Sequence, residues 1–164
     1  MSSGQMAIEN EVRWDHRFLS LAQQIGSWSK DRSTRVGCVI VSPDRAVISS
    51  GYNEFPRGID DEVPSRHERP EKYLWTEHAE RNAIYNAARE GIRIRDCQLY
   101  LSWFPCADCA RAIVQSGIAT LVAIRPDLNH LSWGEHFRIA TALLTEGGVQ
   151  IRLYDAVSVT EPSP

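Results

Sequence analysis

The 164-residue sequence has neither a long apolar run nor an excess of positive charge. No stretch approaches the roughly 20 consecutive apolar residues that a membrane-spanning helix needs. The first residues lack the basic-then-apolar pattern of a signal peptide. Only four cysteines are present, which argues against a disulfide framework and for a reducing compartment. We therefore expect a cytoplasmic protein with no membrane partner.

The net charge of −3 disfavours binding of a nucleic-acid polymer over the whole surface. Basic residues nevertheless cluster in two stretches of the chain. These residues are Lys30, Arg32 and Arg35, then Arg57, Arg66 and Arg69. A local basic pocket in an acidic protein fits a small anionic ligand, so a small-molecule partner is expected and a nucleic-acid partner is not.

The composition is that of one globular domain, with 43% hydrophobic and 24% charged residues. The N-terminal residues 1–12 and the C-terminal residues 156–164 show little pattern. We expect a frayed N-terminus over 1–12, a single domain over 13–155 and a flexible tail over 156–164.

Hydrophobic periodicity predicts an α/β fold. Helices are expected at 14–29, 79–90, 106–117 and 133–146, and strands at 36–41, 46–52, 97–101, 119–124 and 148–154. The first two strands are separated by a short turn and should form a hairpin. Helical crossovers join the last three strands, which should run parallel. The segment 53–77 has no sustained period, and such a long irregular segment is usually functional.

The pattern His78-Ala79-Glu80, followed by Pro105-Cys106-Ala107-Asp108-Cys109, is the most informative feature. One His and two Cys supply three zinc ligands, which leaves a tetrahedral ion one open position for water. Glu80 is close enough to serve that water as a proton carrier. This combination is that of the zinc-dependent deaminases of cytosine or adenine rings.

The spacing also predicts where the metal lies. Two residues on a helix are about 200° apart, so His78 and Glu80 can both face a metal only beyond the helix N-terminus. Cys106 and Cys109 fall on one face of the first turn of their own helix. Two helix N-termini should therefore converge on the ion, and their positive dipole ends favour thiolates.

Each part of the pattern has a simpler interpretation. A C-x-x-C pair alone can be a redox pair or half of a structural zinc site, and Glu80 can cap its helix. No second C-x-x-C completes a four-ligand site in this sequence. Cys38 and Cys97 fall in or beside expected strands and are interpreted as buried small hydrophobes.

From about residue 14 to 154 the chain resembles the cytidine deaminase-like superfamily and, within it, the deoxycytidylate deaminase family. The matching stretches are SKD (29–31), TRVGCVIV (34–41), GYNEFPRG (51–58), HAERNAI (78–84), LYLSWFPCADC (99–109) and QSGI (115–118). The resemblance implies a three-layer α/β/α sandwich built on a five-stranded mixed sheet, with helices on both faces.

The resemblance also implies a zinc-dependent hydrolytic deaminase that converts dCMP and water to dUMP and ammonia. Zn²⁺ would be bound by His78, Cys106 and Cys109, and Glu80 would move the protons. Members of the family are often oligomeric, so a homo-oligomer is expected.

Four substrate contacts are predicted in addition. Asn53 would bind the substrate near its ring and sugar, and Ala79 would offer its backbone N–H to the ring carbonyl. Backbone carbonyls near Ser102–Phe104 would accept from the amino group. Arg57 is the first candidate for the phosphate, with Arg66 and Arg69 after it.

The sequence departs from the family pattern at Glu54, where Gly is usual, and at Arg125–His130, which replaces a tyrosine-bearing segment. The segment 53–77 lacks the His and Cys ligands that some members use for a second zinc. Several functions remain open. They are a deaminase of another base, nucleoside or modified nucleotide such as cytosine or guanine, a riboflavin-pathway deaminase, an RNA or single-stranded DNA editor, and a non-catalytic zinc protein.

Overall fold

Five strands form a single mixed sheet in the computed structural model, which describes residues 2–156. The strands are β1 (Gly37–Val41), β2 (Val47–Tyr52), β3 (Gln98–Leu101), β4 (Thr120–Ile124) and β5 (Gln150–Tyr154). Their order across the sheet is β2-β1-β3-β4-β5. Each strand begins and ends within two residues of its expected range.

The pairing of the strands follows the expected pattern. β1 is antiparallel to β2, with Cys38 opposite Gly51, and antiparallel to β3, with Cys38 opposite Leu101. β3, β4 and β5 run parallel to one another. The predictions of a hairpin and of three parallel strands are therefore confirmed.

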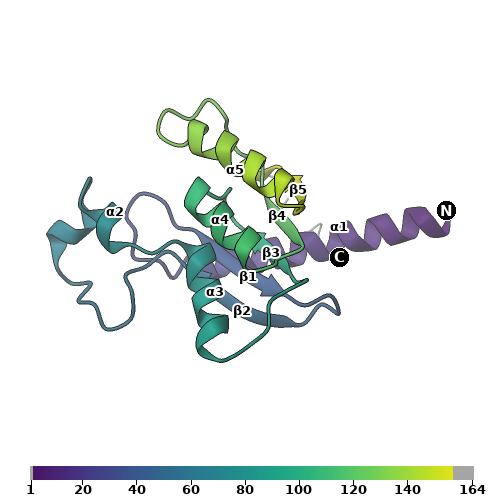
Figure 1. Cartoon of the computed structure of the whole chain (residues 1–164), viewed down its shortest axis with the longest axis horizontal. Helices are drawn as coiled ribbons and strands as arrows, with labels where there is room; N and C mark the ends of the chain where they lie inside the picture. The colour runs from purple at the N-terminus through teal and green to yellow at the C-terminus, as the bar shows by residue number, and fades with distance from the viewer. Residues whose placement is uncertain (1, 157–164) are drawn as a thin grey trace.

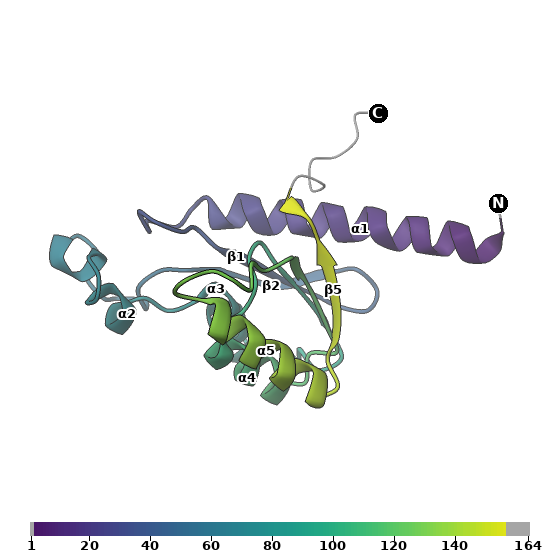
Figure 2. The same ribbon diagram turned by 90° about the horizontal axis from the view of Figure 1, so that it is seen from above.

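Helices cover both faces of the sheet, as Figures 1 and 2 show. The four longer helices are α1 (Ser3–Gly26), α3 (Ala79–Arg89), α4 (Ala107–Gln115) and α5 (Gly134–Glu146). α1 packs on one face, and α3, α4 and α5 lie on the other. The predicted three-layer α/β/α sandwich is confirmed.

The helix α1 is longer toward the N-terminus than the apolar pattern predicts. It begins at Ser3, where Ser2 accepts a hydrogen bond from the N–H of Gln5, and ends at Gly26 rather than at residue 29. Its buried residues begin only at Asp15. The apolar period thus marks the packed half of α1, whereas the exposed half over residues 3–12, expected to be frayed, is helical and extends beyond the sheet.

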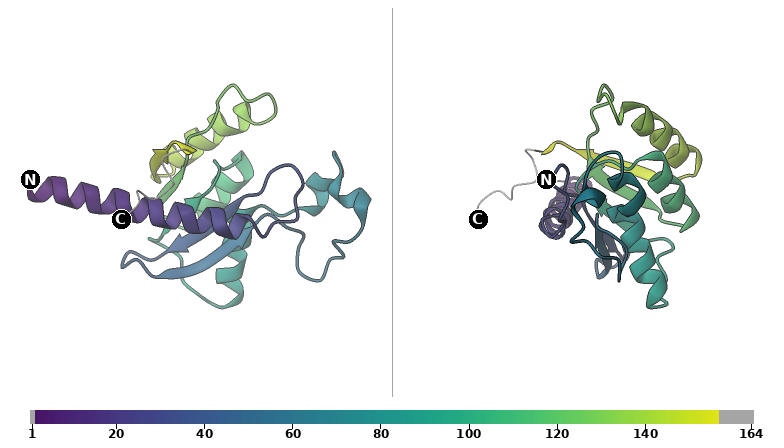
Figure 3. Two further views of the ribbon diagram at one scale, coloured as in Figure 1. Left: turned by 180° about the vertical axis from the view of Figure 1, so that it is seen from behind. Right: turned by 90° about the vertical axis from the view of Figure 1, so that its left-hand side faces the viewer.

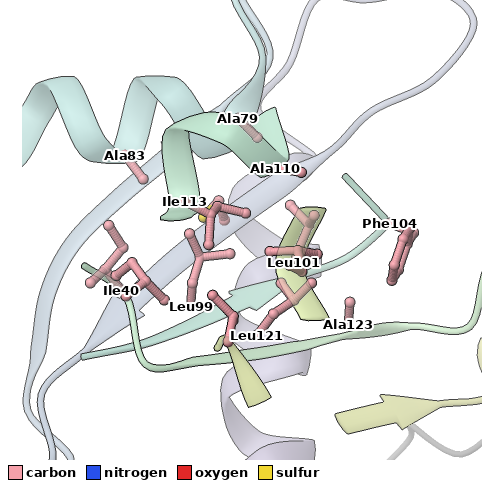
Figure 4. Close-up of a cluster of buried hydrophobic side chains, with 14 of the residues drawn as sticks. Ile40, Ala79, Ala83, Leu99, Leu101, Phe104, Ala110, Ile113, Leu121 and Ala123 are labelled. Atoms are coloured by element: carbon pink, nitrogen blue, oxygen red, sulfur yellow. The ribbon is translucent and has the colours of Figure 1, made fainter. Parts of the chain in front are cut away.

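Alternating side chains of β1 fill two cores. Cys38 and Ile40 face the core shared with α3, α4 and α5, and Val39 and Val41 face the core shared with α1. Figure 4 shows the first core, where β-strand side chains meet the small residues of α3 and α4. Because β1 is buried on both faces, its sequence is continuously apolar rather than alternating. Cys38 and Cys97 are both buried in the first core, as expected.

A glycine allows α3 to lie close against β2. A Cβ atom at Gly51 would collide with the backbone of Ala79 and Ala83. This close approach holds the N-terminal turn of α3, which carries His78 and Glu80, against the sheet.

The segment 53–77 contains two short helices, η1 (Pro64–His67) and α2 (Lys72–Trp75). Its two ends are joined by the N–H of Glu54, 3.1 Å from the carbonyl oxygen of Glu77, and by the reverse bond of 2.8 Å. Figure 3 shows the segment at the end of the molecule opposite the N-terminus. The segment is therefore a closed loop whose base lies directly before His78.

No helix within residues 2–156 has the length and apolar character required to cross a membrane. The tail predicted over 156–164 lies, apart from its first residue, outside the described residues.

Candidate metal and catalytic site

The N-terminal ends of α3 and α4 carry the three predicted metal ligands. His78 is the N-cap residue of α3 and Cys106 the N-cap residue of α4, both with extended backbone. Neither side chain caps its own helix, so both extend past the helix end. Cys109 lies in the first turn of α4. The two helix N-termini meet at one place, as the spacing in the sequence predicts.

The distances among these side chains are those of a zinc site. His78 Nδ1 lies 3.5 Å from the Sγ atoms of both Cys106 and Cys109, and the three ligand atoms lie within 4.8 Å of one another. A tetrahedral ion with Zn–S bonds of about 2.3 Å and Zn–N bonds of about 2.0–2.1 Å holds nitrogen and sulfur about 3.5 Å apart. The arrangement fits zinc, and three ligands leave the fourth position open.

The two thiols are electrostatically unequal. The hydrogen bond from the Cys109 thiol, together with the contact to His78, lowers the pKa of Cys106 to about 4. The same contact with Cys106 and burial raise the pKa of Cys109 well above its ordinary value. The contact between the two sulfurs thus favours the thiolate on Cys106, and a cation bound between them would favour ionisation of both.

Glu80 is a buried carboxylate that faces the same cavity as His78 and Cys106. Burial raises the pKa of its carboxyl group above the ordinary range. A carboxylate with a raised pKa is a better proton acceptor near neutral pH. The N-terminus of α3 has no side-chain capping bond.

A cavity partly open to solvent lies in front of these residues. Its aromatic walls come from α2, from the segment after β3, and from α5 and the loop before it. They consist of Tyr73, Trp103, Phe104, Trp133 and Phe137. The ring of Trp133 lies 6.2 Å from the ring of His78 and 6.3 Å from that of Tyr73, measured between centroids. Flat apolar walls beside a polar end suit an aromatic ring.

Asn53 lines the cavity and is also fixed to the backbone behind it. Its Oδ1 accepts from the N–H of Val36 at 2.8 Å, and its Nδ2 donates to the carbonyl oxygen of Thr34 at 2.9 Å. An amide can accept two hydrogen bonds and donate two. These contacts use half of that capacity, so Asn53 both shapes the wall and retains groups for a ligand.

Of the other predicted contacts, Ala79 is buried as the first residue of α3, beside the metal ligands. Ser102 does not line the cavity, and its Oγ accepts from the N–H of Gly37 at 2.9 Å, whereas Trp103 and Phe104 after it do line the cavity. Arg57 is not brought to the cavity. Its guanidinium is exposed and donates to Asn86 Oδ1 at 2.7 Å.

Sequence reasoning did not identify several residues of the cavity, and it ranked Arg69 below Arg57. The additional polar lining residues are Asp31, Thr34, Lys72 and Thr76. Lys72 Nζ donates to Asp31 Oδ2 at 2.8 Å, and both side chains are largely buried. Two features of the sequence pointed to this part of the cavity, namely the irregular segment 53–77 and the SKD motif. The contact between Lys72 and Asp31 joins residues 41 positions apart, and hydrophobic periodicity does not reveal such a contact.

Comparison with known proteins identifies a family model and several relatives that resemble this chain. Residues 12–125 match the family model described as the cytidine and deoxycytidylate deaminase zinc-binding region. The chain is 39% identical over 140 residues to an uncharacterised deaminase encoded 3′ of luxG in Aliivibrio fischeri, covering 85% of this chain and 92% of that relative. It is 42% identical over 111 residues to a probable deoxycytidylate deaminase of Caenorhabditis elegans, covering 66% of this chain and about half of that relative, 55%.

A solved structure has the same fold. The dCMP deaminase of the cyanophage S-TIM5, determined in complex with dCMP and dUMP, superposes with a TM-score of 0.70 at 20% identity. The match covers 88% of this chain and 97% of that one.

Proposed function

Because the chain belongs to the cytidine and deoxycytidylate deaminase family, a family of zinc-dependent hydrolytic deaminases, we propose that it converts dCMP and water to dUMP and ammonia. The observation that supports this most strongly is a buried Glu80 in one cavity with His78 and Cys106. A purely structural zinc site has four protein ligands and needs neither an open cavity nor a proton carrier. Relatives named deoxycytidylate deaminase support the choice of substrate.

His78, Cys106 and Cys109 are assigned as the ligands of the ion. When bound, zinc supplies a Lewis acid that lowers the pKa of water to about 7. Glu80 accepts a proton from the attacking water and delivers it to the ring nitrogen, which breaks the aromaticity of the ring. The oxygen of the water bonds to the ring carbon that bears the amino group. Glu80 then takes the second proton of the water from that oxygen and passes it to the amino group, whose bond to the ring carbon breaks. The oxygen of water replaces the amino nitrogen, and ammonia leaves.

The remaining residues orient the ring. The first-turn N–H of Ala79 donates to the ring carbonyl, and Asn53 binds near the ring and sugar. The backbone of 102–104 accepts from the amino group. The aromatic walls around Trp133 exclude water from the ring faces, which strengthens each of these polar contacts.

We also propose a domain organisation, a location and an assembly for the protein. A single deaminase domain over 13–155 is supported by the family match over 12–125. A cytoplasmic location is consistent with four cysteines that are unpaired in the described chain. Assembly as a homo-oligomer stays a prediction from the family resemblance.

Ammonia release from purified, zinc-loaded protein tests the proposal. The substrates compared are dCMP, deoxycytidine, cytosine, guanine and a short single-stranded oligonucleotide. The largest kcat/KM is expected for dCMP. A preference for a free base or for the oligonucleotide would replace dCMP as the substrate, and absence of ammonia from every compound would contradict a deaminase.

A further inference from the structure

Two cationic side chains line the cavity in front of the metal ligands, and they differ in their surroundings. Lys72 is already neutralised, because its Nζ lies 2.8 Å from Asp31 Oδ2 and 2.7 Å from Ser33 Oγ. Only 11% of the Lys72 side chain and 9% of the Asp31 side chain are exposed. This buried pair is a rigid part of the wall with no net charge.

Arg69 is the second cation. Its guanidinium has no ion pair or hydrogen-bond partner within residues 2–156, although it lines the cavity and is exposed at its rim. An unpaired guanidinium beside an aromatic-walled cavity has five donors available for a ligand. Its planar fork matches two oxygens of a phosphate group.

The other cations of the segment 53–77 are engaged elsewhere. Arg57 donates to Asn86 outside the cavity. Arg66 stacks on Trp75, with its guanidinium carbon 4.0 Å from the ring centroid, and donates to the carbonyl oxygen of Asp60 at 2.8 Å. Neither lines the cavity.

We propose that Arg69 recognises the 5′-phosphate of the substrate and sets the preference for a nucleoside monophosphate over a nucleoside. This inference rests on the proposed function, because it concerns the same cavity. Asp31 holds the ammonium of Lys72 in the wall of the same cavity.

The first experiment compares dCMP with deoxycytidine in the zinc-loaded full chain. The enzymes are the wild type, Arg69→Ala, Arg69→Lys and a matched control, Arg89→Ala. Arg89 is an exposed arginine in the last turn of α3 and does not line the cavity. Arg69→Ala should lower kcat/KM for dCMP by roughly 10- to 100-fold, the range for losing a charged hydrogen-bonded contact. The value for deoxycytidine should change less than about 2-fold.

Arg69→Lys should recover part of the loss, because it keeps the charge without the bidentate fork. Arg89→Ala should leave the ratio of the two kcat/KM values as in the wild type. Arg57→Ala tests the alternative predicted from the sequence, that Arg57 binds the phosphate. If the ratio of kcat/KM for dCMP to that for deoxycytidine fell in Arg57→Ala and not in Arg69→Ala, the inference would be overturned. An unchanged ratio in Arg69→Ala would also overturn it.

Calorimetric binding of dUMP and deoxyuridine separates this inference from the proposed function. The product carries the phosphate but no amino group, so its binding does not depend on turnover. Weaker dUMP binding by Arg69→Ala, with unchanged deoxyuridine binding, supports the phosphate contact even if dCMP is not deaminated. Two results would overturn the role of Arg69 and still leave the proposed deaminase activity standing. One is that the wild type deaminates dCMP and deoxycytidine with equal kcat/KM. The other is that the wild type and Arg69→Ala bind dUMP equally well.

Discussion

Replacement of Glu80 by Gln is the most direct test of the chemistry. The two side chains have nearly the same shape, so the buried position in α3 stays filled. Gln cannot accept and return a proton. Loss of a single general acid–base group costs about 10²–10⁴ in rate, and Glu80 is assigned more than one transfer. We expect turnover of dCMP to fall by at least that factor.

The effect on stability should be small, because two contributions oppose each other. A carboxylate in the first turn of a helix contributes about 0.3–1 kcal/mol through the helix dipole. Burial of the Glu80 carboxylate, which raises its pKa, acts in the opposite direction. For a domain of this size 1 kcal/mol corresponds to about 2–4 °C. The Tm of Glu80→Gln should therefore stay within about 4 °C of wild type.

The assay combines three measurements on the same preparations, namely ammonia release, zinc content and Tm. Glu90→Gln is the matched control, since Glu90 is exposed at the other end of α3. It should match the wild type in all three. Glu80→Gln that retains more than a tenth of the wild-type rate would show that another group moves the protons. Loss of zinc in Glu80→Gln would assign Glu80 a structural role instead.

Three further results are expected. Cys106→Ala should abolish stoichiometric zinc binding and lower Tm, measured by elemental analysis and calorimetry, because the metal joins two helix N-termini; full zinc content would contradict the site. Asn53→Ala should lower kcat/KM with zinc retained, and should also cost about 1–3 kcal/mol of unfolding free energy, because the N–H of Val36 loses its partner; unchanged stability would contradict the observed bonds. Burial raises the pKa of Asp31, but the ammonium of Lys72 and backbone N–H groups outweigh it and lower that pKa to about 2, below the unfolded value of 3.8. The net contribution of the ionised Asp31 carboxylate, about 2 kcal/mol from its contacts with Lys72, Ser33 and Thr34 together, is therefore present above about pH 4 and lost as the pH falls toward 2. The stability difference between wild type and Asp31→Asn in denaturant titrations should shrink over that interval, and a constant difference would refute the assignment.

Local patterns in the sequence were sufficient to predict most of the fold. The strands β1 to β5 are short apolar runs separated by clear turns or helices, and each was located within two residues. The boundary of α1 was less accessible. Its packed half has an apolar stripe, but residues 3–12 are exposed on every side and show no burial period.

The sequence alone was sufficient to predict the three side chains that could hold a zinc ion and to nominate Glu80 as the proton carrier. His78 and Glu80 are two residues apart, and Cys106 and Cys109 are three apart, so each pair is positioned by the geometry of a single helical turn. The tertiary structure had only to bring two such turns together.

The polar wall of the cavity was decided only by the tertiary structure. Arg57 and Arg69 are chemically identical in the sequence, yet Arg57 is bonded to Asn86 outside the cavity, and Arg69 lies at the rim of the cavity with no partner among the described residues. Likewise, Lys72 is neutralised by Asp31, 41 residues earlier in the chain. Which cation is free depends on the path of the irregular segment 53–77. That path is set by long-range contacts rather than by a local period, and so only the folded chain shows it.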